Sequence, residues 1–247
     1  MKRLIAVVMM CFTLLSCLTG CSSGEENKKV VDENFYCEVI DENNIAIGNV
    51  KTYPKDGAVF FPEQIENYTV SEIGFASGFG FGGNGYLFTI KEGEPNIQRC
   101  YFPHTIKKVM GGYTTLASDL KLFYCGEVID LICLDDQHRN REIYVPAEKY
   151  DLFKNVLSEQ YFRGSLFKAN VSYHLNYDED NYYYVDYYEN GEKILYIPPI
   201  PQRDGYTFGG WFKEAECINQ WDFDTDTLQL SEKTQEIKLY AKWIAKQ

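Results

Sequence analysis

The chain has 247 residues, of which 45% are hydrophobic and 16% aromatic, including twenty tyrosines. That much apolar surface offsets the entropy of folding, which excludes an intrinsically disordered protein and suits one large or two modest domains. The formal net charge is −12, and the chain contains no basic run. An acidic surface repels phosphate backbones, so we expect no nucleic-acid partner.

The first twenty-one residues have the organisation of an export leader. Lys2 and Arg3 form a positive start, and the apolar run that follows, up to Leu18, is shorter than the ~20 residues that cross a bilayer. The run ends in the letters LTGC, whose cysteine is Cys21, and this ending resembles the lipobox of bacterial lipoproteins. The alternative is an ordinary secretory signal in which Cys21 is incidental.

The resemblance to lipoproteins implies a signal peptide over residues 1–20, lipid attachment at Cys21 and a flexible tether over residues 21–34. Two acyl chains, such as palmitate, on one cysteine anchor a protein stably, whereas one chain binds only marginally. We therefore expect an extracytoplasmic protein at the cell surface, held to the membrane by an N-terminal lipid anchor.

Five cysteines remain after the leader and the anchor, without a CxxC pair or another metal-ligand spacing. They are Cys37, Cys100, Cys125, Cys133 and Cys217. Scattered cysteines in an exported protein are expected to be small buried hydrophobes. The alternative is one disulfide, Cys125–Cys133 or Cys100–Cys125.

A hairpin is predicted directly after the tether. The stretch NFYCEVIDENNIAIGNVK, which begins at Asn34, consists of two short apolar segments separated by the polar letters DENN. β-Prone segments on either side of such a turn indicate two paired strands.

Three prolines follow short β-prone pairs in the next part of the chain. Pro62, Pro103 and Pro146 are separated by 41 and 43 residues, and a further β-prone patch lies within each interval. The underlying period is therefore roughly 20–25 residues with one short strand per unit, which is typical of a leucine-rich-repeat solenoid.

The letters YTVSEIGFASGFG and FPHTIKKV within this part resemble the repeat units of BspA-like bacterial surface antigens, over roughly residues 58–155. The resemblance implies a short, degenerate solenoid whose stacked turns share one core and need a cap at the end. Tyr150, Phe153, Leu157 and Tyr161 recur at helical spacing after Pro146. We therefore predict a C-terminal capping helix there.

The letters GFGGNG, from Gly80 to Gly85, satisfy the glycine pattern of dinucleotide sites. A strand-like stretch, YLFTI, follows them instead of the helix that such a site requires. We interpret these glycines as a loop between repeat units.

From about Val171 the chain changes to short strands and turns, and it ends in a segment with three tryptophans. This part resembles the internalin B-type or Listeria–Bacteroides repeat, whose pattern is PxxPxxxGYxFxGWYxD followed by WDF and LYAKW. The matching positions are Pro198, Pro201, Gly205, Tyr206, Phe208, Gly210, Trp211, Trp221, Asp222, Phe223, Leu239, Tyr240, Ala241, Lys242 and Trp243. The resemblance implies a small β-grasp-like module without enzymatic activity, used as a spacer or for interactions in exported surface proteins.

The tryptophans Trp211, Trp221 and Trp243 have two interpretations. A row of exposed tryptophans stacks on sugars, but large aromatic side chains also fill the core of a small module. We expect these three to form the core.

Motifs for calcium binding and for catalysis are incomplete. The letters DFDTD, from Asp222, resemble the start of a calcium loop, but Thr227 and Lys233 stand where that loop needs glycine and glutamate. We expect a solvated strand end there. The three histidines, His104, His138 and His174, are scattered without partners at ligand spacing. We predict no catalytic residue, no cofactor and no metal site.

The tyrosine-rich letters YYYVDYY supply the one candidate contact surface. Alternation along a strand would place Val185 and Tyr187 on the core-facing side and Tyr182, Tyr184 and Tyr188 on the other side, with Asp186. Exposed tyrosines are common at binding surfaces because they offer a large contact area at a low entropy cost. The alternative is that they are ordinary strand residues.

Together these predictions describe a mainly β (α+β) chain with a leucine-rich-repeat-like domain over residues 35–165 and a β-grasp-like module over residues 170–247. The expected function is adhesion or protein–protein interaction at the cell surface, with an unknown protein or glycan as ligand. The alternative is a cell-wall-associated enzyme or a substrate-binding accessory lipoprotein. A concave pocket with convergent polar groups, or a histidine beside Cys100, Cys125 or Cys133, would favour that alternative.

Overall fold

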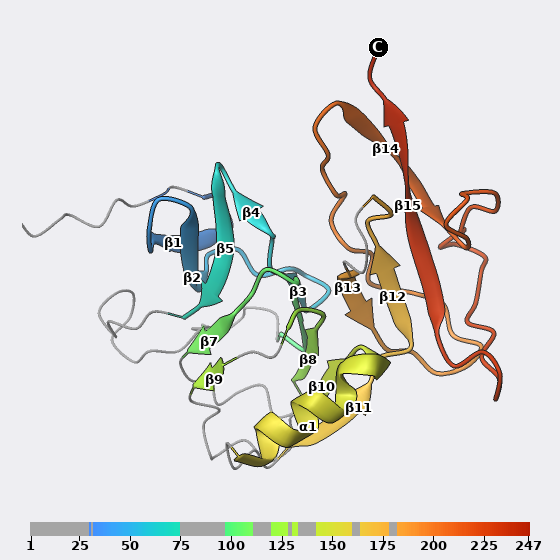
Figure 1. The fold of residues 1–247 in the computed structure, drawn as a ribbon, viewed down its shortest axis with the longest axis horizontal. Coiled ribbons are helices and arrows are strands. Elements are labelled where there is room, and N and C mark those ends of the chain that lie inside the picture. Colours follow the sequence, from blue (N-terminus) through green and yellow to red (C-terminus); the bar gives the residue numbers. More distant parts are fainter. Residues whose placement is uncertain are drawn as a thin grey trace, which may run out of the picture.

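The computed structural model describes residues 30, 32–74, 97–110, 120–127, 130–132, 142–159, 164–177 and 182–247. Within these residues the chain forms three β-sheets and one α-helix (Figure 1). The predicted signal peptide, Cys21, the letters GFGGNG, Cys133, His138 and Tyr161 lie outside the described residues. The end of the predicted tether belongs to the fold, because Val30 is buried in a hydrophobic core.

The first sheet has the order β1-β2-β5-β7-β9, with β4 beside β5. Its strands are β1 (Phe35–Val39), β2 (Asn44–Val50), β4 (Gln64–Ile65), β5 (Tyr68–Ile73), β7 (Lys108–Met110) and β9 (Asp130–Ile132). The pairs β1/β2 and β4/β5 are antiparallel, and the other pairs are parallel. The hairpin predicted from Asn34 is confirmed as β1 and β2, and the Asp41 carboxylate accepts hydrogen bonds from the Asn43 and Asn44 backbone N–H groups in its turn.

The second sheet consists of five parallel strands in the order β11-β10-β8-β6-β3. These strands are β3 (Ala58–Phe60), β6 (Arg99–Phe102), β8 (Lys121–Tyr124), β10 (Glu142–Val145) and β11 (Ser165–Lys168). Pro62, Pro103 and Pro146 stand just after three of them, where a residue without an N–H group ends the ladder. β11, which ends at Lys168, is the last strand of this sheet along the chain. We therefore call the described residues up to Lys168 the N-terminal half.

The predicted leucine-rich-repeat solenoid is wrong, although the mainly β composition is confirmed. A solenoid of that kind places one strand of every turn in one sheet, whereas successive strands here alternate between two sheets. A period near 20 residues does separate β6, β8 and β10. Each period also contains a second strand, β7 or β9, and that strand joins the first sheet. Spacing alone did not reveal this second strand.

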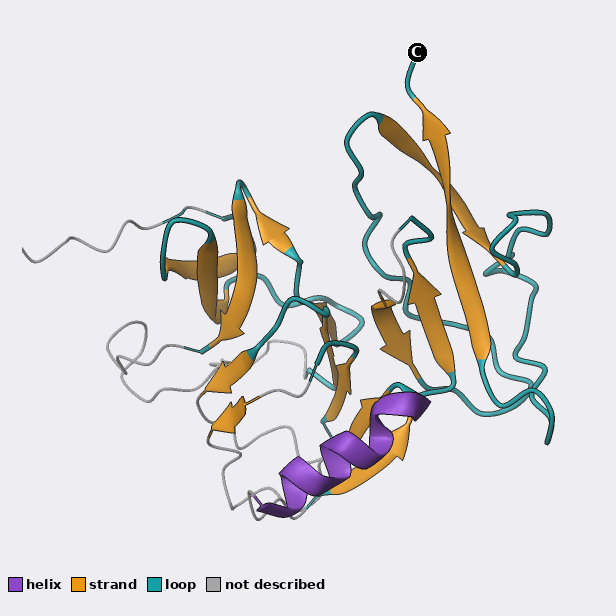
Figure 2. Ribbon diagram, in the orientation of Figure 1, coloured by secondary structure: helices purple, strands orange, loops and turns teal. Residues whose placement is uncertain are grey.

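The second sheet is buried on both of its faces. Phe102 from this sheet and Val109 from the first sheet belong to one hydrophobic core, which lies between the two sheets. Tyr101, Phe123 and Tyr144, on the other face, belong to the core shared with the C-terminal residues. The second sheet therefore lies between the first sheet and the C-terminal part of the chain (Figure 2).

The predicted helix is present. After Pro146 comes a short 3-10 turn, Ala147–Lys149, and then α1 (Tyr150–Glu159). Phe153 and Leu157 are buried in the core of the N-terminal half, as their spacing predicted. Figure 2 shows the helix beside β10 and β11 at one end of the second sheet.

Residues 170–247 form the C-terminal module, a four-stranded sheet in the order β13-β12-β15-β14. Its strands are β12 (Val171–His174), β13 (Tyr182–Asp186), β14 (Tyr206–Phe212) and β15 (Ile237–Ala245). The central pair, β12 and β15, is parallel, and both outer pairs are antiparallel. A β-grasp fold places a helix between its second and third strands, but residues 187–205 connect β13 to β14 without one. The similarity of this module to a β-grasp fold is therefore limited to the sheet.

The tryptophans of the module fill its interior. Trp211 and Trp221 are buried in the module core, as expected. Trp243 is half-buried, packs against that core and donates its indole N–H to the Leu175 carbonyl oxygen. These side chains therefore do not form an exposed row for stacking on sugars.

The acidic letters DFDTD form an exposed turn rather than the expected strand end. The Asp226 carboxylate accepts a hydrogen bond from the Asp222 N–H, and the Asp222 carboxylate accepts one from the Asp224 N–H. Asp226 also forms an ion pair with Lys213, with 2.9 Å between nitrogen and oxygen. The carboxylates thus stabilise the turn itself.

Candidate functional site

The tyrosines that form the candidate contact surface lie inside the protein. Tyr182, Tyr184 and Tyr188 are 5%, 0% and 4% exposed. The face of β13 that carries Tyr182 and Tyr184 is turned toward the second sheet: the Tyr184 hydroxyl donates to the Phe61 carbonyl oxygen at 2.6 Å, and the Tyr182 hydroxyl donates to the Glu148 carboxylate. The apolar outer face of the second sheet covers them. They are a contact surface between two parts of one chain, not a surface open to a partner.

The outer face of the second sheet carries a row of stacked rings, which we call the aromatic ladder. Its members are Phe60, Tyr101, Phe123, Tyr144 and Phe167, one from each strand. Neighbouring ring centroids are 4.0, 4.7, 4.9 and 5.2 Å apart, and the rings are nearly parallel. Parallel strands in register are about 4.8 Å apart, so equivalent side chains on them stack.

The C-terminal module packs on this ladder. The ring of Tyr184 meets Phe60 edge-on, with centroids 5.2 Å apart, and Tyr187 packs against Tyr144 at 5.1 Å. Edge-to-face and offset aromatic pairs add to the gain from burying their area. The ladder therefore joins the two parts of the chain through aromatic packing.

A buried ion pair lies at the centre of this junction. The Arg99 guanidinium is 2.6 Å from the Asp186 carboxylate, and these side chains are 12% and 1% exposed. Asp186 also accepts hydrogen bonds from the Tyr101 hydroxyl at 2.9 Å and from the Tyr187 backbone N–H at 2.7 Å. The charge of the carboxylate is thus met by three donors, which a buried carboxylate requires.

Aromatic rings enclose the guanidinium of the same pair. The Arg99 guanidinium carbon lies 5.0 Å from the centroid of Phe123, 5.2 Å from that of Tyr188 and 4.6 Å from that of Tyr196. Burial raises the pKa of Asp186 to about 6, although the charge of Arg99 and the hydrogen bonds act in the opposite direction. The pair is therefore enclosed at the junction and has no open side for a substrate.

Cys125 follows β8, and His104 follows the neighbouring strand β6. Cys125 nevertheless lacks the environment of a nucleophile. Its thiol is fully buried against the carbonyl oxygens of Phe102 and Tyr183, both at 3.3 Å. Burial raises the pKa of this thiol, so it stays protonated. His104 is instead paired with Glu63, with 2.9 Å between Nδ1 and the carboxylate oxygen. Cys125, which takes part in both alternative disulfides, is a free thiol, so neither of them forms.

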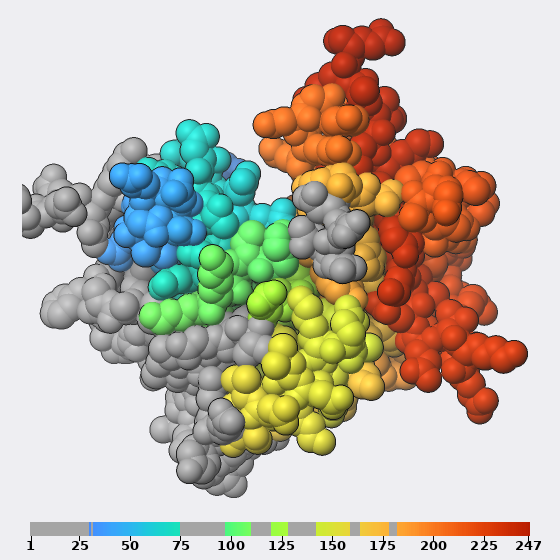
Figure 3. Space-filling model, viewed as in Figure 1, coloured from blue at the N-terminus to red at the C-terminus, as the bar shows by residue number. Residues whose placement is uncertain are grey.

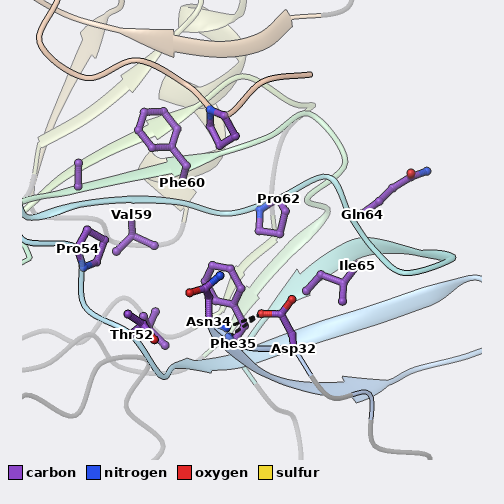
Figure 4. A pocket seen from close by; sticks show the side chains of 13 residues that line it. Asp32, Asn34, Phe35, Thr52, Pro54, Val59, Phe60, Pro62, Gln64 and Ile65 are labelled. Atoms are coloured by element: carbon purple, nitrogen blue, oxygen red, sulfur yellow. Dashed lines mark hydrogen bonds between the residues drawn. The ribbon is translucent and has the colours of Figure 1, made fainter. Parts of the chain in front are cut away.

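An open pocket of about 520 Å³ lies at the edge of the junction. Residues from β1 to β4 supply most of its wall, and Pro199 of the C-terminal module completes it. Figure 4 shows Asp32 and Asn34 on one side of this space and Phe60 and Pro62 across from them. Figure 3 shows the surface hollowed between the cyan part of the N-terminal half and the orange part of the module.

The C-terminal module is similar to a known domain. Residues 170–242 match the Listeria-Bacteroides repeat domain. Every hallmark position from Pro198 to Trp221 lies inside this range, and the resemblance drawn from those letters is confirmed for the C-terminal module. The repeat supplies Asp186 to the ion pair and Pro199 to the pocket.

Two proteins of Evansella cellulosilytica are similar to part of the chain. One, named "Putative membrane protein", is 30% identical over 76 residues, and the other, named "Putative Gly-rich membrane protein", is 29% identical over 76 residues. Each match covers 26% of this chain but only 11% and 8% of the relatives. The chain therefore shares one segment with much longer proteins. Among the residues that the structure describes, no helix is both long and apolar enough to cross a membrane.

The aromatic ladder and the ion pair are the features that we did not predict from the sequence. The ladder had a signal: the letters FFP, YFP and YVP put an aromatic residue at the same distance before each proline. In-register strands would then stack these rings. The contact between Arg99 and Asp186 spans 87 residues and joins the repeat to the N-terminal half, so no local sequence pattern predicts it.

Proposed function

We propose that this chain is a lipid-anchored cell-surface protein that binds a ligand outside the membrane, in adhesion or protein–protein interaction, without catalysing a reaction. The leader that ends at Cys21 supports the anchor. The repeat at residues 170–242 supports a surface location, because the resemblance implies exported surface proteins. The relatives that carry a similar segment are named as membrane proteins, which is consistent with this location.

The observation that carries the binding part of the proposal is the pocket built by both halves. Its inner wall is apolar, with Phe35, Val59 and Ile65 buried, and its rim carries exposed polar side chains such as Asn34 and Gln64. Ligand pockets combine these two kinds of surface. No histidine, cysteine, serine or lysine is among the residues that line it, so the described wall suits binding rather than turnover.

The same pocket also supports a second candidate, a substrate-binding accessory lipoprotein. That function needs a concave site with polar groups, and Asp32, Asn34 and Gln64 are among the residues that line this one. The two candidates differ in the ligand: an accessory protein captures a free small molecule, whereas an interaction protein binds a segment of a larger partner. Competition by free small molecules distinguishes them.

The anchor is tested by labelling bacteria that produce the full chain with radioactive palmitate. We expect label on the wild-type chain, its recovery in the membrane fraction, and its digestion when intact cells are treated with protease. Cys21→Ser should lose both the label and the membrane retention. Cys17→Ser changes a leader cysteine and is the matched control, which should behave as the wild type. Label retained by Cys21→Ser would refute the anchor.

The binding function is tested on the same cells. Cells that display the wild-type chain should be retained on immobilised matrix proteins, cell-wall polymers or other surface proteins more strongly than cells without the chain. Equal retention on every one of these surfaces would refute the interaction function, whatever the outcome of the labelling.

A further inference from the structure

The pocket has one charged wall residue, and that residue is acidic. Among the residues that line it, only Asp32 carries a charge. One oxygen of its carboxylate, Oδ1, accepts hydrogen bonds from the Asn34 and Phe35 N–H groups at 2.8 and 2.9 Å. The other oxygen, Oδ2, has no hydrogen-bond partner in the described part of the chain. The Lys51 ammonium, which does not line the pocket, donates to the main-chain carbonyl oxygen of Asp32 at 2.6 Å and not to the carboxylate. A carboxylate oxygen free at the edge of an apolar space is suited to a cation, and the chain as a whole is acidic, at −12.

The rim also presents two amide side chains. Asn34 and Gln64 are exposed, and within the described residues neither side-chain amide has a hydrogen-bond partner. Each amide offers one acceptor and two donor hydrogens, which match the N–H and C=O groups of an extended peptide backbone. A peptide segment can thus be held along the rim by its main chain.

The inner wall accepts aliphatic groups. Pro54, Pro62 and Pro199 line it together with the buried side chains of Val59 and Ile65. Proline rings and branched aliphatic side chains offer a surface for leucine, isoleucine, valine or proline. A volume of about 520 Å³ falls within the ~300–1,000 Å³ of ordinary ligand pockets and suits a short stretch of chain with its side chains.

The aromatic wall is less suited to a glycan. Sugars stack on exposed ring faces, but one face of Phe60 is stacked on Tyr101 at 4.0 Å, and the Tyr184 ring meets Phe60 edge-on. Phe35 is buried and packs against Phe61 at 5.8 Å.

We propose that this pocket binds an extended peptide segment of a partner protein in which a lysine or arginine stands next to an aliphatic residue or a proline. The aliphatic side chain enters between the prolines, and the cation pairs with Oδ2 of Asp32. The Asn34 and Gln64 amides bond to the peptide backbone. This proposal rests on the interaction function proposed above and names the chemistry of its partner.

The repeat takes part in this site through Pro199, which is exposed and lies on the stretch Leu195–Pro201. Leu195, Ile197 and Ile200 of the same stretch are 71%, 49% and 72% exposed. They are exposed apolar side chains on the same stretch as Pro199. Recognition therefore requires the module to be seated on the N-terminal half, which the aromatic ladder and the ion pair ensure.

The test uses the full chain in detergent and fluorescence anisotropy of a labelled hexapeptide of alternating leucine and arginine. We expect saturable binding, and no binding of the matched hexapeptide in which glutamate replaces arginine. Asp32→Asn should weaken the binding about tenfold, as expected for the loss of one charge pair. It should fold normally, because the asparagine oxygen can still accept from the two backbone N–H groups, and its thermal unfolding checks this.

Two further variants separate the pocket from general attraction to an acidic protein. Asp224→Asn removes the same charge from an exposed turn of the module and should leave the affinity unchanged. Pro199→Ala should weaken the binding severalfold, because it removes the contribution of the repeat. Equal affinities of Asp32→Asn and Asp224→Asn would overturn the proposal.

A neutral tetrasaccharide, chitotetraose, tests the other class of ligand. We expect it not to displace the peptide. Displacement, or binding of the sugar in place of the peptide, would identify a glycan site and overturn the proposal. Retention of cells on a protein surface that is insensitive to Asp32→Asn would overturn the peptide pocket while leaving the interaction function in place. The two proposals therefore fail in distinguishable ways.

Discussion

Arg99 and Asp186 form an ion pair of 2.6 Å across the junction between the N-terminal half and the repeat. Asp186 is almost completely buried, and the rings of Phe123 and Tyr196 flank the guanidinium. A pair in this position gains from its hydrogen bonds but loses hydration on both charges. Removing one partner should therefore lower the free energy of unfolding more than removing both.

Replacing Asp186 alone should destabilise the chain strongly. Asp186→Leu leaves the Arg99 charge buried without a counter-ion, and we expect the free energy of unfolding to fall by about 3–5 kcal/mol. The double variant Arg99→Leu/Asp186→Leu should recover a large part of that loss. Urea unfolding of the four proteins of the cycle measures the coupling. Strictly additive effects would contradict the pair. Glu236→Gln, in a more exposed ion pair at 3.7 Å, is the control and should change stability by less than about 1 kcal/mol.

The same carboxylate should make stability depend on pH. Burial raises the pKa of Asp186 to about 6 from an ordinary value of 3.8. Between these values the folded chain binds the proton more often than the unfolded chain does. The contribution of Asp186 to stability therefore falls as the pH rises from about 4 to 6, and it is constant above that range.

Comparison with Asp186→Asn isolates this effect, because asparagine does not titrate. The difference in free energy of unfolding between wild type and variant should move against the wild type by roughly 1 kcal/mol per pH unit between pH 4 and 6. Urea unfolding at pH 4, 5, 6 and 7 measures it. A difference that is constant, or that grows in favour of the wild type, would show that the carboxylate does not titrate in this range.

The hydroxyl of Tyr184 should contribute to the seating of the repeat. It is fully buried and donates to the Phe61 carbonyl oxygen at 2.6 Å. Tyr184→Phe keeps the ring but leaves that carbonyl without its donor, so the free energy of unfolding should fall by about 1–2 kcal/mol. Tyr206→Phe, at a half-exposed tyrosine, is the control and should stay within about 0.5 kcal/mol of the wild type. Equal effects of the two variants would contradict the contact.

Gly126 should not tolerate a side chain. A Cβ at this position would lie 2.8 Å from the carbonyl oxygen of His104, and backbone atoms cannot move aside cheaply. We expect Gly126→Ala to lower the free energy of unfolding by about 1–3 kcal/mol. Without the clash, a change from glycine to alanine would stabilise the chain by up to ~1 kcal/mol through the unfolded state. A lower midpoint of thermal unfolding for Gly126→Ala would therefore confirm the clash, and a higher midpoint would contradict it.

Patterns that act over short distances were predictable. The hairpin from Asn34 has its turn residues and its strands within one stretch of sequence. The helix after Pro146 was predictable from the spacing of Phe153 and Leu157, both of which are buried. In the same way, the ordered letters around Trp211 predicted the repeat at residues 170–242.

The solenoid was wrong for a reason that lies in the fold. Spacing of β-prone letters locates strands along the chain, but it does not say which sheet each strand joins. The strands β7 and β9 have partners in the first sheet, whereas β6 and β8 have partners in the second. That choice depends on contacts between segments that are far apart in sequence.

The tyrosines of β13 show the same division. Alternation correctly placed Tyr182 and Tyr184 on one face of β13, because side-chain direction along a strand is a local property. It was wrong for Tyr187, which follows the strand and packs against Tyr144 of the second sheet. Which part of the chain covers that face does not follow from the local sequence. Burial of apolar surface is non-directional, so a pattern defines a face without naming its partner. The aromatic ladder, the ion pair with Arg99 and the pocket closed by Pro199 were decided only when the tertiary structure brought the two halves together.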